Sequence, residues 1–175
     1  MKTIVGNNIT KAIEFLNNGE VIAMPTETVY GFAANALDES AVKKLFNLKK
    51  RPYSQAISIQ ISSVKKIKEL IKVMPKNAEK LAENFWPGPL TMIFDKSDYI
   101  SDLVTGGKST VGIRIPEHEQ SLRLLKKISY PLAVPSANIH NQISCTSAKD
   151  VFKKFKNKIN YILDGGESSK GIKST

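Results

Sequence analysis

The sequence predicts an α/β fold in a single domain over residues 1–175, and three observations carry that prediction. Segments with the apolar spacing of helices alternate along the chain with short runs of β-branched residues. A chain of 175 residues suits one domain, which buries roughly 70% of the surface that its unfolded chain would expose. No linker-like stretch and no internal repeat divides it. We therefore expect one sheet with flanking helices.

The first expected helix covers residues 8–18, where four apolar residues have helical spacing and Gly19 stops the pattern. Residues 21–23 are β-branched or small and apolar, so they predict a short strand that Pro25 ends.

Asp38 is the expected N-cap of a second helix. This helix should end by Arg51, because Pro52 disfavours the helical conformation of the residue before it. The buried face of the helix would carry four apolar residues: Ala41, Val42, Leu45 and Phe46.

The rest of the chain continues the alternation. Residues 56–61 alternate apolar and polar side chains, which is typical of a strand. Ser147 and Asp150 have the spacing of a capping box, which predicts a helix through Phe155. The remaining expected elements are helices over 63–72 and 75–85 and strands over 89–94, 110–115, 131–134 and 161–163.

The chain carries an excess of positive charge, because 26 lysines and arginines against 16 acidic residues give a formal net charge of +10. Such a charge favours anionic partners, either a nucleotide or a nucleic acid. Some of these lysines could equally form a solvated helix face: Lys153, Lys154, Lys156 and Lys158.

A single cysteine, Cys145, excludes an internal disulfide and a zinc site built on several thiolates. With His118 and His140 as the two histidines, the sequence predicts no resident metal site. No signal-like N-terminal segment and no run of about 18 apolar residues is present, so we expect no membrane contact and a cytoplasmic protein.

Polar residues gather where expected strands end, which is where ligand sites form in open α/β sheets. Residues 25–31, PTETVYG, could hold an amino acid or a phosphate, although a solvated turn is the simpler interpretation. Residues 49–52, KKRP, place cations at a helix end. The helix dipole alone would stabilise them there, and Arg51 could also offer its planar fork to a phosphate or carboxylate.

Two later segments have the same character. In residues 110–116, strand alternation places Thr110, Gly112 and Arg114 on one face. The arginine needs an anionic partner there, which a structural carboxylate or a ligand could supply. In residues 135–138, PSAN, the loop could present donors to a phosphate or serve only its own turn.

Three apparent motifs are not interpreted as functional. Residues 106–110 end like a P-loop, but Asp102 stands where the first glycine belongs. Residues 166–171, GESSKG, lack the glycine spacing of a dinucleotide site. Cys145 and His140 are close in sequence, which is no evidence for a nucleophile and its base.

Together, the order and spacing of these segments resemble the YrdC/TsaC family of threonylcarbamoyl-adenylate synthases. The matching motifs cover nearly the whole chain: PTETVYG at 25–31, KKRP at 49–52, WPGPLT at 86–91, VGIRIP at 111–116, SAN at 136–138 and GIKST at 171–175. The resemblance implies a YrdC-like fold, which is a twisted, mixed parallel and antiparallel open sheet with flanking helices and a basic concave site.

The resemblance also implies which residues form the site. Charge stabilisation during catalysis would come from Lys49, Arg51 and Arg114. The ATP site would be formed by Arg51, Gln55, Thr110, Ser136, Asn138 and Ser144. The threonine site would be formed by Thr28, Gln60, Arg114, Val134 and Ser174.

The implied reaction joins L-threonine, bicarbonate and ATP into threonylcarbamoyl-AMP and releases pyrophosphate, with Mg²⁺ accompanying ATP and no tightly bound cofactor. The product serves the threonylcarbamoyl-adenosine modification of tRNA. The expected partners are therefore downstream threonylcarbamoyl-transferase proteins and tRNA or double-stranded RNA. Positioning and charge stabilisation suffice for such a reaction, and we expect no protein nucleophile.

The chain departs from the family pattern at three places. Residues 55–57, Gln-Ala-Ile, and Gln60 replace an Asn-Pro-Leu segment and a His, and Gln60 can donate a hydrogen bond but cannot act as a base. His140 and Asn141 replace Ser and Gly. Relatives also continue through a further strand with a later Arg, which a chain ending at Thr175 is expected to lack.

Two other functions compete with this one. A non-catalytic module for double-stranded or structured RNA would also be basic, but binding of single strands usually needs exposed aromatics, which we expect in the core here. A carbamoyl-transfer domain of hydrogenase-maturation proteins shares the motifs but sits within longer chains. Separate strand ends that carry Thr28, Arg51, Arg114 and Ser136 favour the synthase.

Overall fold

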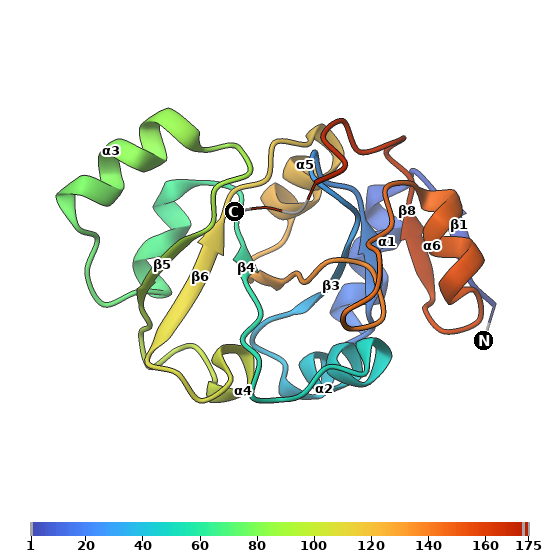
Figure 1. The fold of residues 1–175 in the computed structure, drawn as a ribbon, viewed down its shortest axis with the longest axis horizontal. Helices are drawn as coiled ribbons and strands as arrows, with labels where there is room; N and C mark the ends of the chain where they lie inside the picture. Colours follow the sequence, from blue (N-terminus) through green and yellow to red (C-terminus); the bar gives the residue numbers. More distant parts are fainter. Residues whose placement is uncertain (1, 173, 175) are drawn as a thin grey trace.

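The computed structural model describes residues 2–172 and 174. Within them, eight strands form one sheet in the order β1-β8-β2-β3-β7-β4-β6-β5 (Figure 1). Strands β1–β8, β2–β8 and β4–β6 pair in parallel and the other neighbours are antiparallel, so the sheet is mixed, as expected. The strands are β1 (Ile4–Gly6), β2 (Ile22–Met24), β3 (Gly31–Asn35), β4 (Ile59–Gln60), β5 (Met92–Asp95), β6 (Thr110–Arg114), β7 (Leu132–Ala133) and β8 (Tyr161–Leu163).

Helices flank both faces of the sheet. Successive strand residues point to opposite faces, and their side chains are buried in two separate hydrophobic clusters, one on each face. On β2, Ile22 and Met24 belong to a cluster with α1 (Ile9–Asn17) and α5 (Glu119–Lys127). Ala23, between them, belongs to a larger cluster. The larger cluster also contains residues of α2 (Glu39–Lys49), α3 (Lys76–Phe85), α4 (Asp102–Thr105), α6 (Ala148–Phe155) and the 3₁₀ helix η1 (Val64–Glu69).

The helix caps follow the sequence signals. Asp38 accepts hydrogen bonds from the backbone N–H groups of Ser40 and Ala41 at the start of α2. Ser147 accepts one from Asp150 at 3.1 Å at the start of α6. Each cap satisfies donors that the first helical turn leaves unpaired, so both predicted starts are confirmed.

Several expected elements are shorter than predicted, or of another type. The strand expected over 56–61 pairs as β4 over two residues, and the helix expected over 63–72 is the 3₁₀ helix η1. Four elements were not predicted: β1, β3, α4 and α5. Strand β3 has the sequence GFAAN, which has little intrinsic β-propensity, and it forms because it lies between β2 and β7.

The exposed surface bears on two further expectations. Lys153, Lys154, Lys156 and Lys158 are all exposed along and after α6, as a solvated face would be. Among the described residues, none of the helices combines the length and apolarity that a membrane span requires.

Candidate active site

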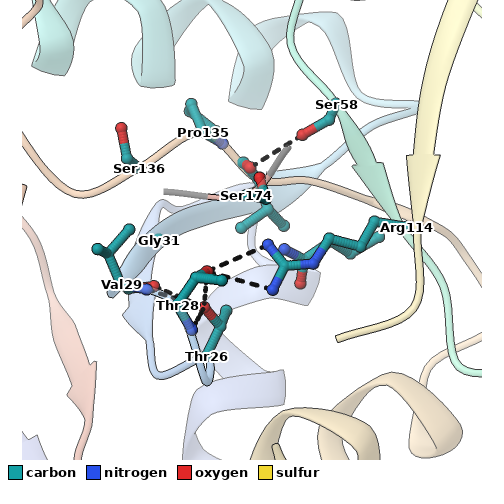
Figure 2. A pocket seen from close by; sticks show the side chains of 11 residues that line it. Thr26, Thr28, Val29, Gly31, Ser58, Arg114, Pro135, Ser136 and Ser174 are labelled. Atoms are coloured by element: carbon teal, nitrogen blue, oxygen red, sulfur yellow. Dashed lines mark hydrogen bonds between the residues drawn. The ribbon is translucent and has the colours of Figure 1, made fainter. Parts of the chain in front are cut away.

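A pocket of about 170 Å³ lies where the loop before β3 meets β4, β6 and the residues after β7 (Figure 2). All five residues expected around threonine line it, which are Thr28, Gln60, Arg114, Val134 and Ser174. We call it the amino-acid pocket. Its remaining lining residues are Thr26, Val29, Gly31, Ser58, Pro135 and Ser136.

The threonines of the PTET segment form a turn that uses its own hydroxyls. Thr26 Oγ1 donates to the carbonyl of Val29 at 2.7 Å and accepts from the backbone N–H groups of Thr28 and Val29. Thr28 Oγ1 lies 2.8 Å from Thr26 Oγ1. Local side-chain bonds of this kind stabilise turns, and here they direct Thr28 toward Arg114.

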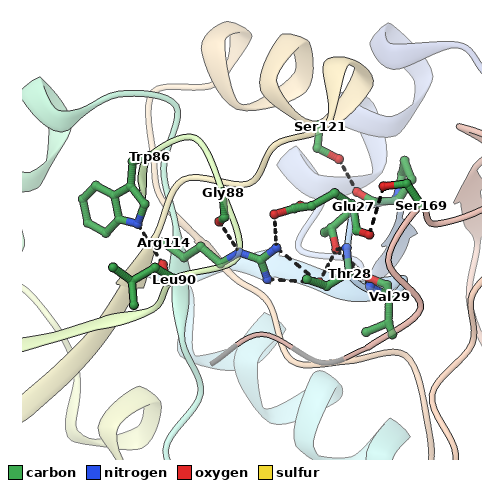
Figure 3. Close-up of polar contacts among 11 residues, drawn as sticks. Glu27, Thr28, Val29, Trp86, Gly88, Leu90, Arg114, Ser121 and Ser169 are labelled. Atoms are coloured by element: carbon green, nitrogen blue, oxygen red, sulfur yellow. Dashed lines mark hydrogen bonds and ion pairs between the residues drawn. The ribbon is translucent and has the colours of Figure 1, made fainter. Parts of the chain in front are cut away.

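Arg114 is 4% exposed and its guanidinium is held from three sides (Figure 3). Nε donates to the carbonyl of Gly88 at 3.0 Å, and both Nη atoms donate to Thr28 Oγ1 at 3.2 Å. Nη2 also lies 2.7 Å from Oε1 of Glu27, which is 3% exposed. The anionic partner left open by the sequence is therefore a structural carboxylate, while Arg114 still lines the pocket.

The WPGPLT segment shapes the loop that presents the Gly88 carbonyl. Trp86 Nε1 donates to the carbonyl of Leu90 at 2.8 Å, and the N–H of Gly88 donates to the carbonyl of Ile115 at 2.9 Å. A Cβ on residue 88 would lie 2.3 Å from the carbonyl oxygen of Phe85, so glycine is required here.

A second pocket, of about 370 Å³, adjoins the first and shares Ser58, Pro135 and Ser136 with it. It contains Arg51, and we call it the phosphate pocket after the ligand that the sequence leads us to expect for this residue. Its other lining residues are Ala56, Ile57, Thr91, Ile93 and Gly112. Val111 and Ile113, which flank Gly112 on β6, are buried in the larger cluster, so the predicted alternation along this strand is confirmed.

The end of α2 positions Arg51. Lys50 adopts the left-handed conformation with φ 52°, and the N–H of Arg51 donates to the carbonyl of Phe46 at 3.0 Å, which closes the helix. The Arg51 side chain donates from Nε to Gln55 O at 3.2 Å and from Nη2 to Ala56 O at 2.8 Å. Partial burial lowers the pKa of this guanidinium from its ordinary value, which still leaves it charged at neutral pH.

Lys49 holds the loop behind Ser136. Its Nζ donates to the carbonyls of Ser136 and Asn138 and to Asn138 Oδ1, the last two at 2.8 and 3.0 Å. Ser136 Oγ donates to Asn138 Oδ1 at 2.6 Å, and Asn138 Nδ2 donates to the carbonyls of Ile139 and Gln142. Lys49 is 1% exposed, so its charge lies beneath the pocket wall.

Five of the expected site residues line neither pocket. Lys49 and Asn138 are buried in the loop network, and Gln55 contributes its carbonyl to Arg51. Thr110 begins β6 opposite Asp95, and Ser144 lines a separate surface hollow. Direct contact between these five residues and a substrate stays a prediction. Their positions outside the two pockets favour indirect roles, such as holding the pocket walls in place.

Glu27 and Ser58 were not among the site residues expected from the sequence. Ser58 lies two residues before Gln60, on the same face of an extended segment, so alternation could have indicated it. Glu27 had no such signal, because its partner Arg114 is distant in sequence. The expectation of core aromatics was wrong in part, since Tyr53, Phe85 and Tyr99 are about half exposed on separate elements.

Burial also shifts the pKa of side chains outside the two pockets. Burial raises the pKa of the Cys145 thiol to about 11, so it is protonated at neutral pH. Burial also lowers the pKa of His118. Among the described residues, no group of three His, Cys, Asp or Glu side chains could hold a metal ion.

Known proteins match nearly the whole chain. It is 47% identical over 164 residues to a threonylcarbamoyl-AMP synthase of Pyrococcus abyssi, an alignment that covers 94% of this chain and 48% of that protein. It is 40% identical over 168 residues to a threonylcarbamoyl-AMP synthase of Bacillus subtilis, with 95% and 49% covered. The chain thus spans about half the length of these curated relatives.

A solved structure matches the fold described above. The crystal structure of P. abyssi Sua5 complexed with L-threonine superposes with a TM-score of 0.95 at 44% identity, over 100% of this chain and 53% of that chain. The family model Sua5_yciO_yrdC, described as telomere recombination, matches residues 14–175. On this evidence, the chain belongs to the Sua5/YciO/YrdC family.

Proposed function

We propose that this chain catalyses the ATP-dependent synthesis of threonylcarbamoyl-AMP from L-threonine and bicarbonate, for the threonylcarbamoyl-adenosine modification of tRNA. One observation carries the proposal: two cation-bearing pockets share a wall made of Ser58, Pro135 and Ser136. Arg114 serves one pocket and Arg51 the other. The names of the relatives and the L-threonine bound to P. abyssi Sua5 support the same reaction.

The sizes of the pockets suit two substrates of different size. At about 170 Å³, the amino-acid pocket is smaller than the roughly 300–1,000 Å³ of pockets that hold drug-sized ligands. The phosphate pocket, at about 370 Å³, falls within that range. A small amino acid in the first pocket and the phosphates of ATP in the second would therefore meet at Ser136.

The chemistry would proceed across the shared wall. The neutral amine of L-threonine combines with bicarbonate, releasing water and forming a carbamate. A carbamate oxygen then attacks the α-phosphorus of ATP, and the bond to pyrophosphate breaks. Arg114 would orient the threonine carboxylate, and Arg51 would balance the charge that develops on the phosphates. No covalent intermediate with the protein is needed.

Magnesium would enter this site as part of the ATP substrate. Serine and threonine hydroxyls and a guanidinium line the phosphate pocket, which suits phosphate oxygens more than a bare cation. Mg²⁺ is commonly held by substrate phosphates and water with few protein ligands. The ion would neutralise phosphate charge, while Arg51 and Ser136 would fix where the phosphates lie.

The labile product would then pass to threonylcarbamoyl-transferase proteins that act on tRNA. The exposed lysines of α6 and the net charge of +10 would favour an encounter with an acidic partner or with tRNA itself.

Pyrophosphate release tests the proposal. The reaction should require ATP, Mg²⁺, bicarbonate and L-threonine together, and omission of L-threonine should reduce release to background. L-serine in place of L-threonine would show how far the pocket depends on the side-chain methyl group. Release that is independent of any amino acid would contradict the proposal.

A further inference from the structure

A buried ion pair lies behind the amino-acid pocket, between the guanidinium of Arg114 and the carboxylate of Glu27. Nη2 and Oε1 are 2.7 Å apart, and the two side chains are 4% and 3% exposed. Glu27 itself does not line the pocket, whereas Arg114 does. Any effect of the Glu27 carboxylate on a ligand in the pocket is therefore transmitted through Arg114.

Most of the donors of Arg114 face groups of the protein. A guanidinium has five N–H groups. Nε donates to Gly88, and Nη1 and Nη2 each donate to Thr28 Oγ1. Nη2 also lies 2.7 Å from Glu27 Oε1 in an ion pair that lacks the geometry of a hydrogen bond. Among the described residues, the second N–H of Nη2 faces the Glu27 ion pair, so the second N–H of Nη1 is the donor left for a ligand in the pocket. The orientation of the guanidinium plane thus decides where that single donor points.

Glu27 and Arg114 depend on each other for charge balance. Within the described part of the chain, neither carboxylate oxygen of Glu27 has a hydrogen bond, and the ion pair with Arg114 is its one polar side-chain contact. A buried carboxylate without a partner is costly, so Glu27 holds Nη2 strongly. The contacts with Gly88 and Thr28 are neutral and longer, at 3.0 and 3.2 Å.

The main chain of Glu27 is fixed independently of its side chain. Its carbonyl accepts from the N–H of Lys170 at 2.8 Å, and the preceding turn is tied by Ser121 Oγ, which donates to the carbonyl of Pro25. The backbone of Glu27 thus holds its side chain in a fixed place. A change confined to the terminal atoms of the side chain should therefore leave the loop in place.

We propose that Glu27 is a positioning residue of the amino-acid pocket, which orients Arg114 so that its remaining N–H meets the α-carboxylate of the bound amino acid. This inference rests on the proposed function, because it takes an amino acid as the ligand. It predicts that Glu27 contributes specifically to recognition of a carboxylate, and not to binding of the rest of the amino acid.

The test compares L-threonine with L-threoninamide, which lacks the carboxylate, by titration calorimetry on the full chain. The variants are Glu27→Gln, which keeps the shape of the side chain and removes its charge, and Glu27→Asp, which keeps the charge and withdraws it by one methylene. Ser121→Ala is the matched control, because it alters the same loop without touching the guanidinium. Thermal unfolding checks that each variant is folded.

The ratio of L-threonine affinity to L-threoninamide affinity should fall about tenfold in Glu27→Gln and Glu27→Asp, as expected when a charge-assisted contact is weakened. It should not change in Ser121→Ala, and ATP affinity should not change in any variant. An unchanged ratio in the folded Glu27 variants would overturn the inference, as would a larger ratio, which would mean that Glu27 competes with the substrate.

Two further outcomes are decisive. If both Glu27 variants fail to fold, Glu27 serves stability and the positioning role is rejected. If the unaltered chain binds neither L-threonine nor L-threoninamide, the proposed function itself fails, which the variants alone could not reveal.

Discussion

The ammonium group of Lys49 lies 2.8 Å from the carbonyl oxygen of Asn138 and 3.0 Å from its Oδ1, although 89 residues separate the two in the chain. This contact ties the end of α2 to the loop after β7, which forms the wall between the two pockets. A cation that the sequence suggests for substrate contact is therefore placed to hold the site together.

Replacement of Lys49 by Met should destabilise the fold by about 1.5–3 kcal/mol, because several carbonyl and amide groups lose a charged donor in the interior. Urea denaturation measures this change. Lys43→Met on the same helix is the control, because Lys43 is 57% exposed and its contact with Glu39 is 3.9 Å long. The control should change stability by no more than about 0.5 kcal/mol. Equal stability of the two variants would contradict the role given to Lys49.

Replacement of Arg51 by Ala should lower kcat/KM for ATP by about tenfold to a hundredfold, since a charge-assisted phosphate contact contributes about 1.5–3 kcal/mol. L-threonine binding should persist, because Arg51 lines the phosphate pocket and not the amino-acid pocket. Steady-state pyrophosphate release and calorimetry measure the two effects. Lys50→Gly, which suits the left-handed conformation at that position, should leave both unchanged. A normal rate in Arg51→Ala would refute the assignment.

Replacement of Gly112 by Ala should weaken ATP binding several-fold and leave L-threonine binding intact. The added Cβ would lie 3.2 Å from Thr91 Cγ2 and 3.3 Å from Ile93 Cδ1, which are side-chain atoms on the phosphate pocket and can adjust. The protein should therefore fold, with a smaller pocket. Separate titrations with ATP and with L-threonine measure how much the affinity for each ligand changes.

The reverse selectivity is expected for Gly31→Ala. Its Cβ would lie 2.5 Å from Val134 Cγ1 and 3.2 Å from the carbonyl oxygen of Pro135, on the wall of the amino-acid pocket. L-threonine binding should fall more than ATP binding. If Gly31→Ala and Gly112→Ala impair the two ligands equally, the division into two pockets is wrong.

The stability of the protein should fall as pH rises above about 9, in part through Cys145. Burial raises the pKa of this thiol from 9.0 to about 11, so between those values the folded chain retains a proton that the unfolded chain has lost. Stability is then fully present below pH 9 and is lost as pH rises through 11. In urea denaturation from pH 8 to 11, the free energy of unfolding should decline less steeply with pH in Cys145→Ala than in the unaltered chain. Identical pH slopes would contradict this account.

Alkylation of Cys145 provides a separate measurement. The thiol is 1% exposed and protonated at neutral pH, so iodoacetamide should react slowly with the native protein and rapidly in urea. Rapid native reaction would show that the region around Cys145 opens readily.

Local signals in the sequence predicted most of the fold. Asp38 and Ser147 start α2 and α6 because capping depends on neighbouring backbone groups. Helix α5 was missed although its buried residues Ser121, Leu124 and Leu125 have helical spacing, whereas strand β3 could not be predicted from local signals. The residues of β3 are mainly small, and its pairing with β2 and β7 supplies the order that its own sequence does not.

The sequence by itself determined the alternation of helices and strands and the strand faces of β6. Its motifs also indicated which polar residues meet in the amino-acid pocket. Only the tertiary structure decided that Lys49 supports the Ser136 loop from behind and that Glu27 holds Arg114. The physical reason is that caps and alternation depend on residues a few positions apart, whereas a buried charge is satisfied by partners that the fold brings from distant segments.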